Sequence, residues 1–279
     1  MDYGHPIRFG VFVIPEATER PLEHALLADE LGFDLVGVQD HPYQRRFYDT
    51  WTLLTAMAMR TQRITVFPDV ANVPLRPPAI LAKAAATLDL LSSGRLELGL
   101  GAGGFWQGIK AYDGPVRTAG ESVSALEEAI QVIRLLWSGQ HGTRFDGRYY
   151  HLDGAHSGPV PAHPIGIWLG AYKPRMLGLV GRLADGWVPS LGYVQAPDLL
   201  SGNQKIDEAA TAAGRDPKAI RRVLNAGFVD ADTIVSLAVE HGMDTFIVPD
   251  EPDEMRAFMA DVAPRVREQV EARRSRRPD

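Results

Sequence analysis

The feature that most limits the fold of this chain is a regular alternation of strand-like and helix-like segments. Short runs rich in Val, Ile, Leu and Phe are followed by longer runs whose apolar residues recur at helical spacing. The expected strands are Ile7–Ile14, Asp34–Val38, Ile64–Val70, Arg95–Leu100, Ile165–Gly170, Gly186–Pro189, Val223–Val229 and Thr245–Val248. Strand–helix units in strict order favour an α/β protein whose parallel sheet closes into a (β/α)8 TIM barrel. An open doubly wound sheet is the alternative.

The segments between the expected strands carry helix start and stop signals. Thr118 and Glu121 have the spacing of a capping box, and the apolar residues from Val123 to Trp137 share one face of the helix that follows. The other expected helices are Pro21–Leu31, Trp51–Arg60, Pro78–Leu91, Pro174–Leu183, Asn203–Ala213, Asp232–His241 and Asp253–Arg273.

The length of 279 residues suits one barrel, which typically needs about 250. We therefore expect a single domain over residues 1–279. Two irregular insertions are expected, at about 103–120 after the fourth strand and at 139–164 before the fifth. The second contains a segment, Arg148–Leu152, that predicts a short hairpin.

Composition excludes several classes of protein. Without cysteine the chain can form no disulfide, thiolate metal site or cysteine nucleophile, which is consistent with a cytoplasmic location. The segment Met1–Pro6 has no signal-peptide pattern, and no apolar run is long enough to span a membrane. A net charge of −6 argues against nucleic-acid binding. We expect no metal site, because the spacing of four histidines in the second insertion fits no zinc pattern: His141, His151, His156 and His163.

In a barrel, ligands bind where strands end, so the residues just after each strand are the candidates. Asp40 and His41 follow the second strand and could form an acid/base pair, because histidine titrates near neutral pH. The equally weighted alternative is a structural loop in which Asp40 caps backbone amides.

Two further loops contain small residues. Glycines in Gly99–Gly104 permit close approach of a flat ring or a phosphate, but no helix opens directly behind them, so crowding at the barrel rim is the favoured explanation. The loop Gly170–Arg175 precedes a helix N-terminus and carries Lys173 and Arg175, which makes it a candidate phosphate site. Alternatively, both cations are only solvated.

Several segments together resemble the luciferase-like family of flavin oxidoreductases, to which bacterial luciferase belongs. Their order and spacing carry the resemblance, which extends from the first strand to about Trp187. The segments are Gln39–Pro42, Val70–Pro78, Leu88–Arg95 running into Gly99–Gly103, and Ala184–Trp187.

The resemblance implies a barrel that binds FMN or the deazaflavin coenzyme F420 at its C-terminal face. The Asp40-His41 pair is more similar to the deazaflavin branch, in which His41 would transfer a proton and Asp40 would orient it or contact the ring. The resemblance also implies a cis peptide bond before Val70. The residues implied in cofactor binding are Asp40, His41, Asp69, Val70, Ala71, Asn72, Gly101, Ala102, Gly103, Gly170, Ala171, Tyr172, Lys173 and Arg175.

The function expected from this resemblance is oxidoreduction of a small organic substrate with a dissociable cofactor, by F420-dependent hydride transfer or FMN-dependent monooxygenation. Some deazaflavin members carry an acid in the loop here written Gly103–Gln107, and its absence argues against a sugar-phosphate dehydrogenase. A homodimer is expected from the family. The alternatives are a non-redox barrel hydrolase or lyase, and a catalytically silent flavin-binding protein.

Overall fold

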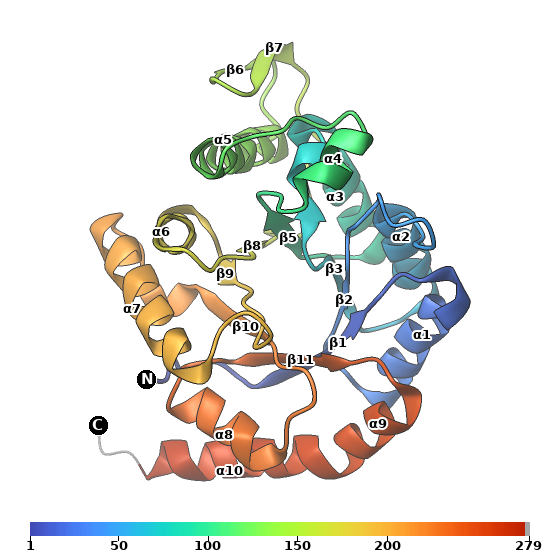
Figure 1. Ribbon diagram of the computed structural model, residues 1–279, viewed down its shortest axis with the longest axis vertical. Coiled ribbons are helices and arrows are strands. Elements are labelled where there is room, and N and C mark those ends of the chain that lie inside the picture. The colour runs from blue at the N-terminus through green and yellow to red at the C-terminus, as the bar shows by residue number, and fades with distance from the viewer. Residues whose placement is uncertain (277–279) are drawn as a thin grey trace.

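A computed structural model describes residues 1–276, so the last part of the expected domain, residues 277–279, lies outside the described residues. Parallel strands line the centre of the molecule and helices surround them (Figure 1). The strands of this sheet are β1 Arg8–Val13, β2 Leu35–Val38, β3 Thr65–Pro68, β4 Ala71–Asn72, β5 Leu98–Gly101, β8 Ile167–Leu169, β9 Gly186–Trp187, β10 Arg221–Asn225 and β11 Thr245–Pro249.

The sheet closes on itself, which confirms the predicted barrel. Its strand order is β3-β2-β1-β11-β10-β9-β8-β5-β4. β3 lies within the expected third strand, and β4 lies just beyond its expected end. The cis peptide bond between Asp69 and Val70 that the resemblance implies separates the two. A parallel bridge between Val66 of β3 and Leu96, just before β5, joins the two ends of the order.

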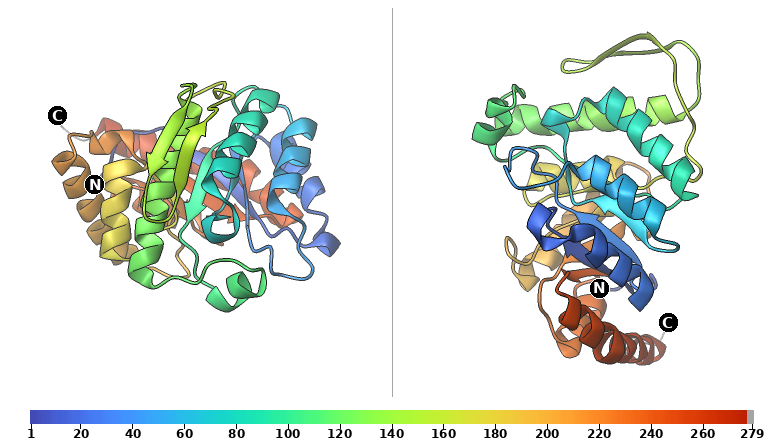
Figure 2. Two further views of the ribbon diagram at one scale, coloured as in Figure 1. Left: turned by 90° about the horizontal axis from the view of Figure 1, so that it is seen from above. Right: turned by 90° about the vertical axis from the view of Figure 1, so that its right-hand side faces the viewer.

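A ring of helices covers the outside of the barrel in all three views (Figures 1 and 2). Within residues 1–276, none of these helices combines the length and the apolar character needed to cross a membrane. The helices are α1 Pro21–Leu31, α2 Thr50–Arg60, α3 Pro78–Ser92, α4 Trp106–Ala111, α5 Ala119–Trp137, α6 Pro174–Leu183, α7 Ala196–Ala212, α8 Ala231–Val239, α9 Pro252–Ala257 and α10 Ala263–Ser275, with short 3₁₀ turns at Ala17–Glu19, Val73–Leu75 and Pro217–Ala219.

The two insertions contain regular structure of their own. The first holds α4 and leads into α5, whose predicted capping box is present: the Thr118 hydroxyl accepts the N–H of Glu121, whose carboxylate accepts the N–H of Thr118. The second holds an antiparallel hairpin, β6 Thr143–Asp146 and β7 His151–Ala155, which projects beyond α5 (Figures 1 and 2).

The expected hairpin through Arg148–Leu152 is confirmed, and residues 148–150 lie in the connection between its two strands. The carboxylate of Glu128 on α5 accepts the backbone N–H groups of Arg148, Tyr149 and Tyr150. These three bonds hold the turn against the helix, and a contact between distant segments of this kind leaves no periodic pattern in the sequence.

Two expected helices also differ. α7 begins seven residues earlier than Asn203, at Ala196, where the Asp198 carboxylate accepts the Gln195 N–H. Glycine is a poor helix former, so Gly202 argued against a helix that includes it. The structure requires glycine there, because an added Cβ would lie 2.6 Å from the Trp187 ring. The helix expected over Asp253–Arg273 is interrupted by a π-helical turn at Phe258–Val262.

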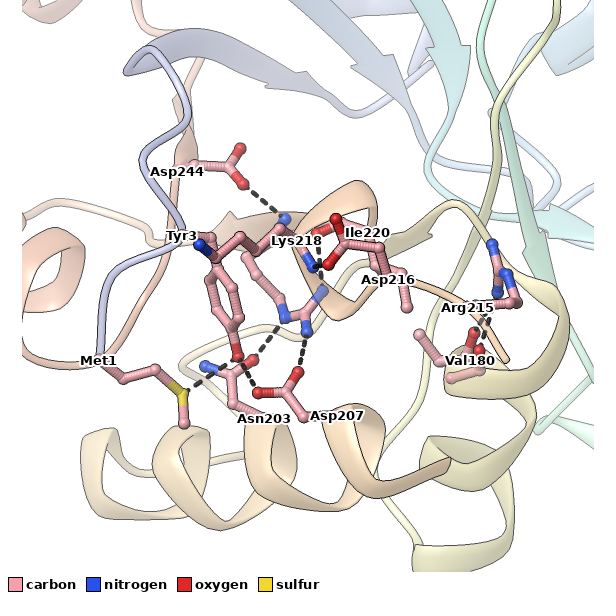
Figure 3. A network of polar contacts seen from close by, with 12 residues as sticks. Met1, Tyr3, Val180, Asn203, Asp207, Arg215, Asp216, Lys218, Ile220 and Asp244 are labelled. Atoms are coloured by element: carbon pink, nitrogen blue, oxygen red, sulfur yellow. Dashed lines mark hydrogen bonds and ion pairs between the residues drawn. The ribbon is translucent and has the colours of Figure 1, made fainter. Parts of the chain in front are cut away.

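A polar network closes the N-terminal end of the barrel (Figure 3). The fully buried guanidinium of Arg222 donates to Asn203 Oδ1 at 2.6 Å and to Asp207 Oδ1 at 2.7 Å. The central carbon of this guanidinium lies 4.5 Å from the centroid of the Tyr3 ring. The Tyr3 hydroxyl donates to Asp207 Oδ2. The network therefore fixes the N-terminal segment to α7 and β10, at the end of the barrel opposite the strand carboxyl ends.

We predict that Arg222→Met lowers the free energy of unfolding by about 3–5 kcal/mol, because it leaves the Asp207 carboxylate and the Asn203 amide without their buried partner. Urea denaturation followed by circular dichroism measures the change. The matched control is Arg144→Met, which removes an ion pair with Asp153 whose side chains are 75% and 84% exposed and should cost less than about 1 kcal/mol. Equal costs for the two variants would contradict the assigned role of Arg222.

Candidate functional site

A cavity of about 610 Å³ opens at the carboxyl ends of the strands, the face where barrel enzymes bind their ligands. The loops after β2, β3, β5, β8, β9 and β10 all contribute to its wall. Phe12, Met176 and Val188 give the wall apolar surface, and a small number of polar groups interrupt it. The arrangement suits a ligand with a flat apolar body and a few hydrogen-bonding atoms.

The carboxylate of Asp40 is bound within the protein. It accepts two hydrogen bonds from Arg76, each 2.7 Å long, and one from the Asn72 N–H at 2.8 Å. Its side chain is fully buried, and Arg76 also donates to Asp49, the residue that caps α2. Asp40 therefore ties the loop after β2 to β4, and it reaches the neighbouring histidine only through its charge.

His41 lines the cavity next to this ion pair. Its Nδ1 lies 2.5 Å from the hydroxyl of Tyr43, and the Tyr43 ring packs edge-on against Phe105 at 5.2 Å. Among residues 1–276, Nε2 of His41 has no hydrogen-bond partner. Burial lowers the pKa of His41, and the Asp40 charge opposes this only in part. The imidazole is therefore neutral at pH 7, with Nε2 left to act toward a ligand.

Val70 follows the cis bond and packs into a space lined by glycines. A Cβ added to Gly101 would lie 2.8 Å from the Val70 side chain; the corresponding distances are 3.1 Å for Gly99 and 3.3 Å for Gly170. Any larger residue at the first two positions would displace Val70. The glycine-rich strand β5 is thus explained by crowding around Val70, as the sequence analysis favoured.

Polar atoms without partners gather on the floor of the cavity. Asp69, Asn72 and Asn225 all line it, and Asp69 Oδ2, Asn72 Oδ1 and Asn225 Oδ1 are buried with no hydrogen-bond partner. Burial raises the pKa of Asp69 to about 7, with the hydrogen bond from Asn225 acting in the other direction. Buried polar atoms of this kind are costly unless a ligand or water satisfies them.

The two cations of the loop after β8 lie in different surroundings. Lys173 lines the cavity and stands at the N-cap of α6. Arg175 points instead toward α5, donating to the Gly120 carbonyl and the Ser124 hydroxyl, each at 2.7 Å. Ala171 is buried, and its carbonyl accepts the Trp187 indole N–H. One cation of the two expected is therefore available to an anion in the cavity.

The structure brings most of the sequence-predicted residues together. Ala171 and Arg175 lie outside the cavity wall, and the wall includes the remainder: Asp40, His41, Asp69, Val70, Ala71, Asn72, Gly101, Ala102, Gly103, Gly170, Tyr172 and Lys173. Within the described chain, no group of three or more His, Cys, Asp or Glu side chains lies close enough to hold a metal ion.

Sequence reasoning missed several residues of the wall. Tyr43 lies two positions after His41, and its aromatic character at a strand end was the available signal. Ser190, Tyr193 and Asn225 follow β9 and β10, where the resemblance was thin. Tyr193 pairs with Tyr172 at 5.5 Å between ring centroids, so the mouth carries an exposed aromatic pair.

Comparison with known proteins identifies the family and several relatives. A family model described as luciferase-like monooxygenase matches residues 6–277. The 5,10-methylenetetrahydromethanopterin reductase of Archaeoglobus fulgidus is 30% identical over 248 residues, covering 88% of this chain and 71% of the relative. The F420-dependent glucose-6-phosphate dehydrogenase of Gordonia bronchialis is 32% identical over 231 residues, covering 79% and 67%. Both relatives are thus longer than this chain.

Solved structures show the same fold. An F420-dependent secondary alcohol dehydrogenase in complex with an F420-acetone adduct superposes with a TM-score of 0.84 at 20% identity, covering 94% of this chain and 99% of its own. The long-chain alkane monooxygenase LadA superposes with a TM-score of 0.80 at 15% identity, covering 99% and 93%. The predicted luciferase-like barrel is confirmed by these matches.

We predict that His41 titrates below its ordinary value of 6.5, because the buried imidazolium loses hydration. A ¹H–¹³C NMR titration of the histidine Cε1–H groups measures this, with His41→Gln used to assign the resonance. The same shift means that His41 destabilises the fold as the pH falls below 6.5, since protonation is favoured in the unfolded chain. A midpoint at or above 6.5 would contradict the burial argument.

Proposed function

The chain belongs to the luciferase-like monooxygenase family, and from that premise we propose that it is an F420-dependent oxidoreductase of a small organic substrate. The observation that carries the proposal is a neutral His41 at the wall of a cavity shaped by Val70 and three glycine positions. The relative that is 32% identical supports the choice of coenzyme, because it is named an F420-dependent glucose-6-phosphate dehydrogenase.

The residues of the cavity fit a flavin-type ring. Val70 and the apolar side chains Phe12 and Val188 offer surface to a flat ring, and the unpartnered atoms of Asp69, Asn72 and Asn225 offer hydrogen bonds to its polar edge. When bound, the deazaflavin supplies hydride transfer. The protein supplies the orientation of the ring and the movement of protons.

Lys173 is the residue that we assign to the cofactor phosphate. It stands at the N-terminus of α6, where backbone N–H groups and the helix dipole favour an anion. Arg175 would contribute only indirectly, because its guanidinium is bonded to α5.

His41 is the residue that we assign to proton transfer. With Nδ1 against the Tyr43 hydroxyl, neutral Nε2 can accept the proton that a substrate hydroxyl loses on oxidation, or return it to a carbonyl on reduction. Asp40 is then a positioning residue, because its carboxylate is bonded to Arg76 and to the Asn72 N–H.

The substrate that the cavity favours is uncharged. Lys173 is the one lysine or arginine among the wall residues, and it is assigned to the cofactor. No acid occurs in Gly103–Gln107, and Phe105, Tyr172 and Tyr193 give the mouth an aromatic surface. The wall therefore offers no second lysine or arginine for the phosphate of a sugar phosphate. The favoured substrate class thus differs from the glucose 6-phosphate for which the dehydrogenase relatives are named.

FMN-dependent monooxygenation is the second candidate. The family description and the fold of the alkane monooxygenase favour it. FMN also brings a flat ring and a phosphate to the cavity, so the choice between the two cofactors rests on the relative that is named for F420.

We predict tight binding of oxidised F420 and at least tenfold weaker binding of FMN, measured by titration with visible absorbance and fluorescence. Lys173→Met should weaken binding of FMN by about tenfold and leave riboflavin, which has no phosphate, unchanged, since one charge-assisted contact of about 1.4 kcal/mol is lost.

Other outcomes of that titration distinguish the alternatives. Tight binding of FMN alone would make monooxygenation the working function. Binding of neither cofactor would favour a non-redox hydrolase or lyase. Binding of F420 without any reductive or oxidative half-reaction in a broad alcohol and carbonyl screen would favour a silent flavin-binding protein.

We also propose a single-domain homodimer located in the cytoplasm, where a chain without cysteine needs no disulfide. The contact would be the exposed apolar side chains of α2 and α3: Met59, Ile80, Leu90 and Leu91. We predict that Ile80→Glu with Leu91→Glu yields a monomer by light scattering, because both side chains are more than half exposed. Val116→Glu, an exposed apolar residue elsewhere, is the control and should stay dimeric; a dimer in all three proteins would place the contact on another face.

A further inference from the structure

Asp69 and Asn225 form a buried polar pair on the cavity floor that neither proton transfer nor phosphate binding uses. Asn225 Nδ2 donates to Asp69 Oδ1 and to Ser190 Oγ, each at 3.3 Å. Asp69 is only 8% exposed. Asp69 Oδ2 and Asn225 Oδ1 both line the cavity side of this pair without a partner.

The pair has a definite hydrogen-bonding character. Burial raises the pKa of Asp69 to about 7, so below that pH the carboxyl is neutral. Since Oδ1 accepts from Asn225, the proton belongs on Oδ2, which then acts as a donor. Asn225 has both amide hydrogens committed to acceptors, so its Oδ1 acts only as an acceptor.

A donor beside an acceptor matches one chemical group: an amide edge, in which a C=O lies next to an N–H. We propose that Asp69 and Asn225 bind the amide edge of a planar heterocycle, with Asp69 Oδ2 donating to its carbonyl and Asn225 Oδ1 accepting its N–H. The inference rests on the proposed function, because flavins and deazaflavins carry such an edge, C4=O beside N3–H, on the pyrimidine ring.

Binding through a neutral carboxyl couples affinity to pH. If Asp69 is ionised, neither of its oxygens can donate to the ligand carbonyl, and the carboxylate repels that carbonyl oxygen. Affinity should therefore fall as the pH rises above 7. The other titratable or charged groups that line the cavity are Asp40, His41, Tyr43, Tyr172, Lys173 and Tyr193. Asp40 is paired with Arg76. Burial raises the pKa of Tyr43 and Tyr172 and lowers the pKa of His41.

A hydroxyl of the cofactor side chain could also bond to Asp69 Oδ2 and Asn225 Oδ1. The probes are therefore chosen to separate the amide edge of the ring from the side-chain hydroxyls. Riboflavin and 5-deazariboflavin have the amide edge, side-chain hydroxyls and no titrating phosphate. Their N3-methyl derivatives keep the hydroxyls and lose only the N–H. Fluorescence titration gives Kd for each from pH 6 to 9.

For the native chain we expect a Kd that is constant below pH 7 and rises by up to about tenfold per pH unit above it. N3-methylation should raise Kd by about tenfold at pH 6. Asp69→Asn keeps a donor and cannot ionise, so it should bind like the native chain at pH 6 and show no pH dependence. Asn225→Ala should bind more weakly and lose the discrimination against N3-methylation.

Asp153→Asn, an exposed acid on the hairpin, is the control for charge and should retain the native pH profile. Three results would each overturn the assignment. One is a native Kd that does not change with pH, and another is an Asp69→Asn Kd that still rises above pH 7. The third is an N3-methyl probe that binds with the same Kd as its parent, which would point to the hydroxyls. Each of these results leaves flavin binding intact. If neither flavin binds any variant at any pH, the proposed function fails and the pair's role fails with it.

Discussion

The ion pair between Asp40 and Arg76 is the interaction on which the site depends. Asp40 lies in the loop after β2, the Asn72 N–H that it accepts belongs to β4, and Arg76 precedes α3, so one carboxylate joins three segments. Arg76 also reaches Asp49 at the start of α2. Removal of Arg76 would leave the fully buried Asp40 carboxylate without its counter-charge, which typically costs about 3–5 kcal/mol. His41 directly follows Asp40 in this loop, so the ion pair fixes the backbone next to it.

Close packing at the strand ends is the second constraint. Val70 occupies space that only glycine leaves free on β5 and after β8, and Asp69 faces the opposite side of the same segment, toward β10. The cavity floor therefore combines an apolar shelf with a polar pair. This combination suits a flat ring with one polar edge, and it explains why glycines and unpartnered polar atoms occur together at the mouth of this barrel.

Much of this arrangement could be predicted from the sequence. Alternating periodicity predicted the barrel, and strand ends predicted the positions of His41 and Lys173 in the wall. The family resemblance predicted the cis bond at Val70, which no propensity indicates. Crowding at the barrel rim, which the sequence analysis favoured for the glycines, is present at Gly99 and Gly101, where an added Cβ would lie close to Pro68 or Val70.

The remainder depends on contacts between distant segments, which no local pattern records. Arg175 was expected beside a phosphate, but carbonyl and hydroxyl acceptors on α5 hold its guanidinium. Asp40 was expected either to pair with His41 or to cap backbone amides. It does accept one backbone N–H, from Asn72, but its main partner is an arginine 36 positions away. Burial raises the pKa of Asp69, and the hydrogen bond from Asn225 on β10 opposes that rise; both effects exist only in the folded chain.

Hydrogen exchange read by mass spectrometry, with and without saturating F420, tests the central claim most directly. The account predicts slower exchange in peptides that cover 39–43, 69–76 and 101–105, and no change at the opposite barrel end around Tyr3 and Arg222. No protection, or protection confined to the separate hollow between Gly227 and Val262, would contradict a cofactor site at this barrel mouth.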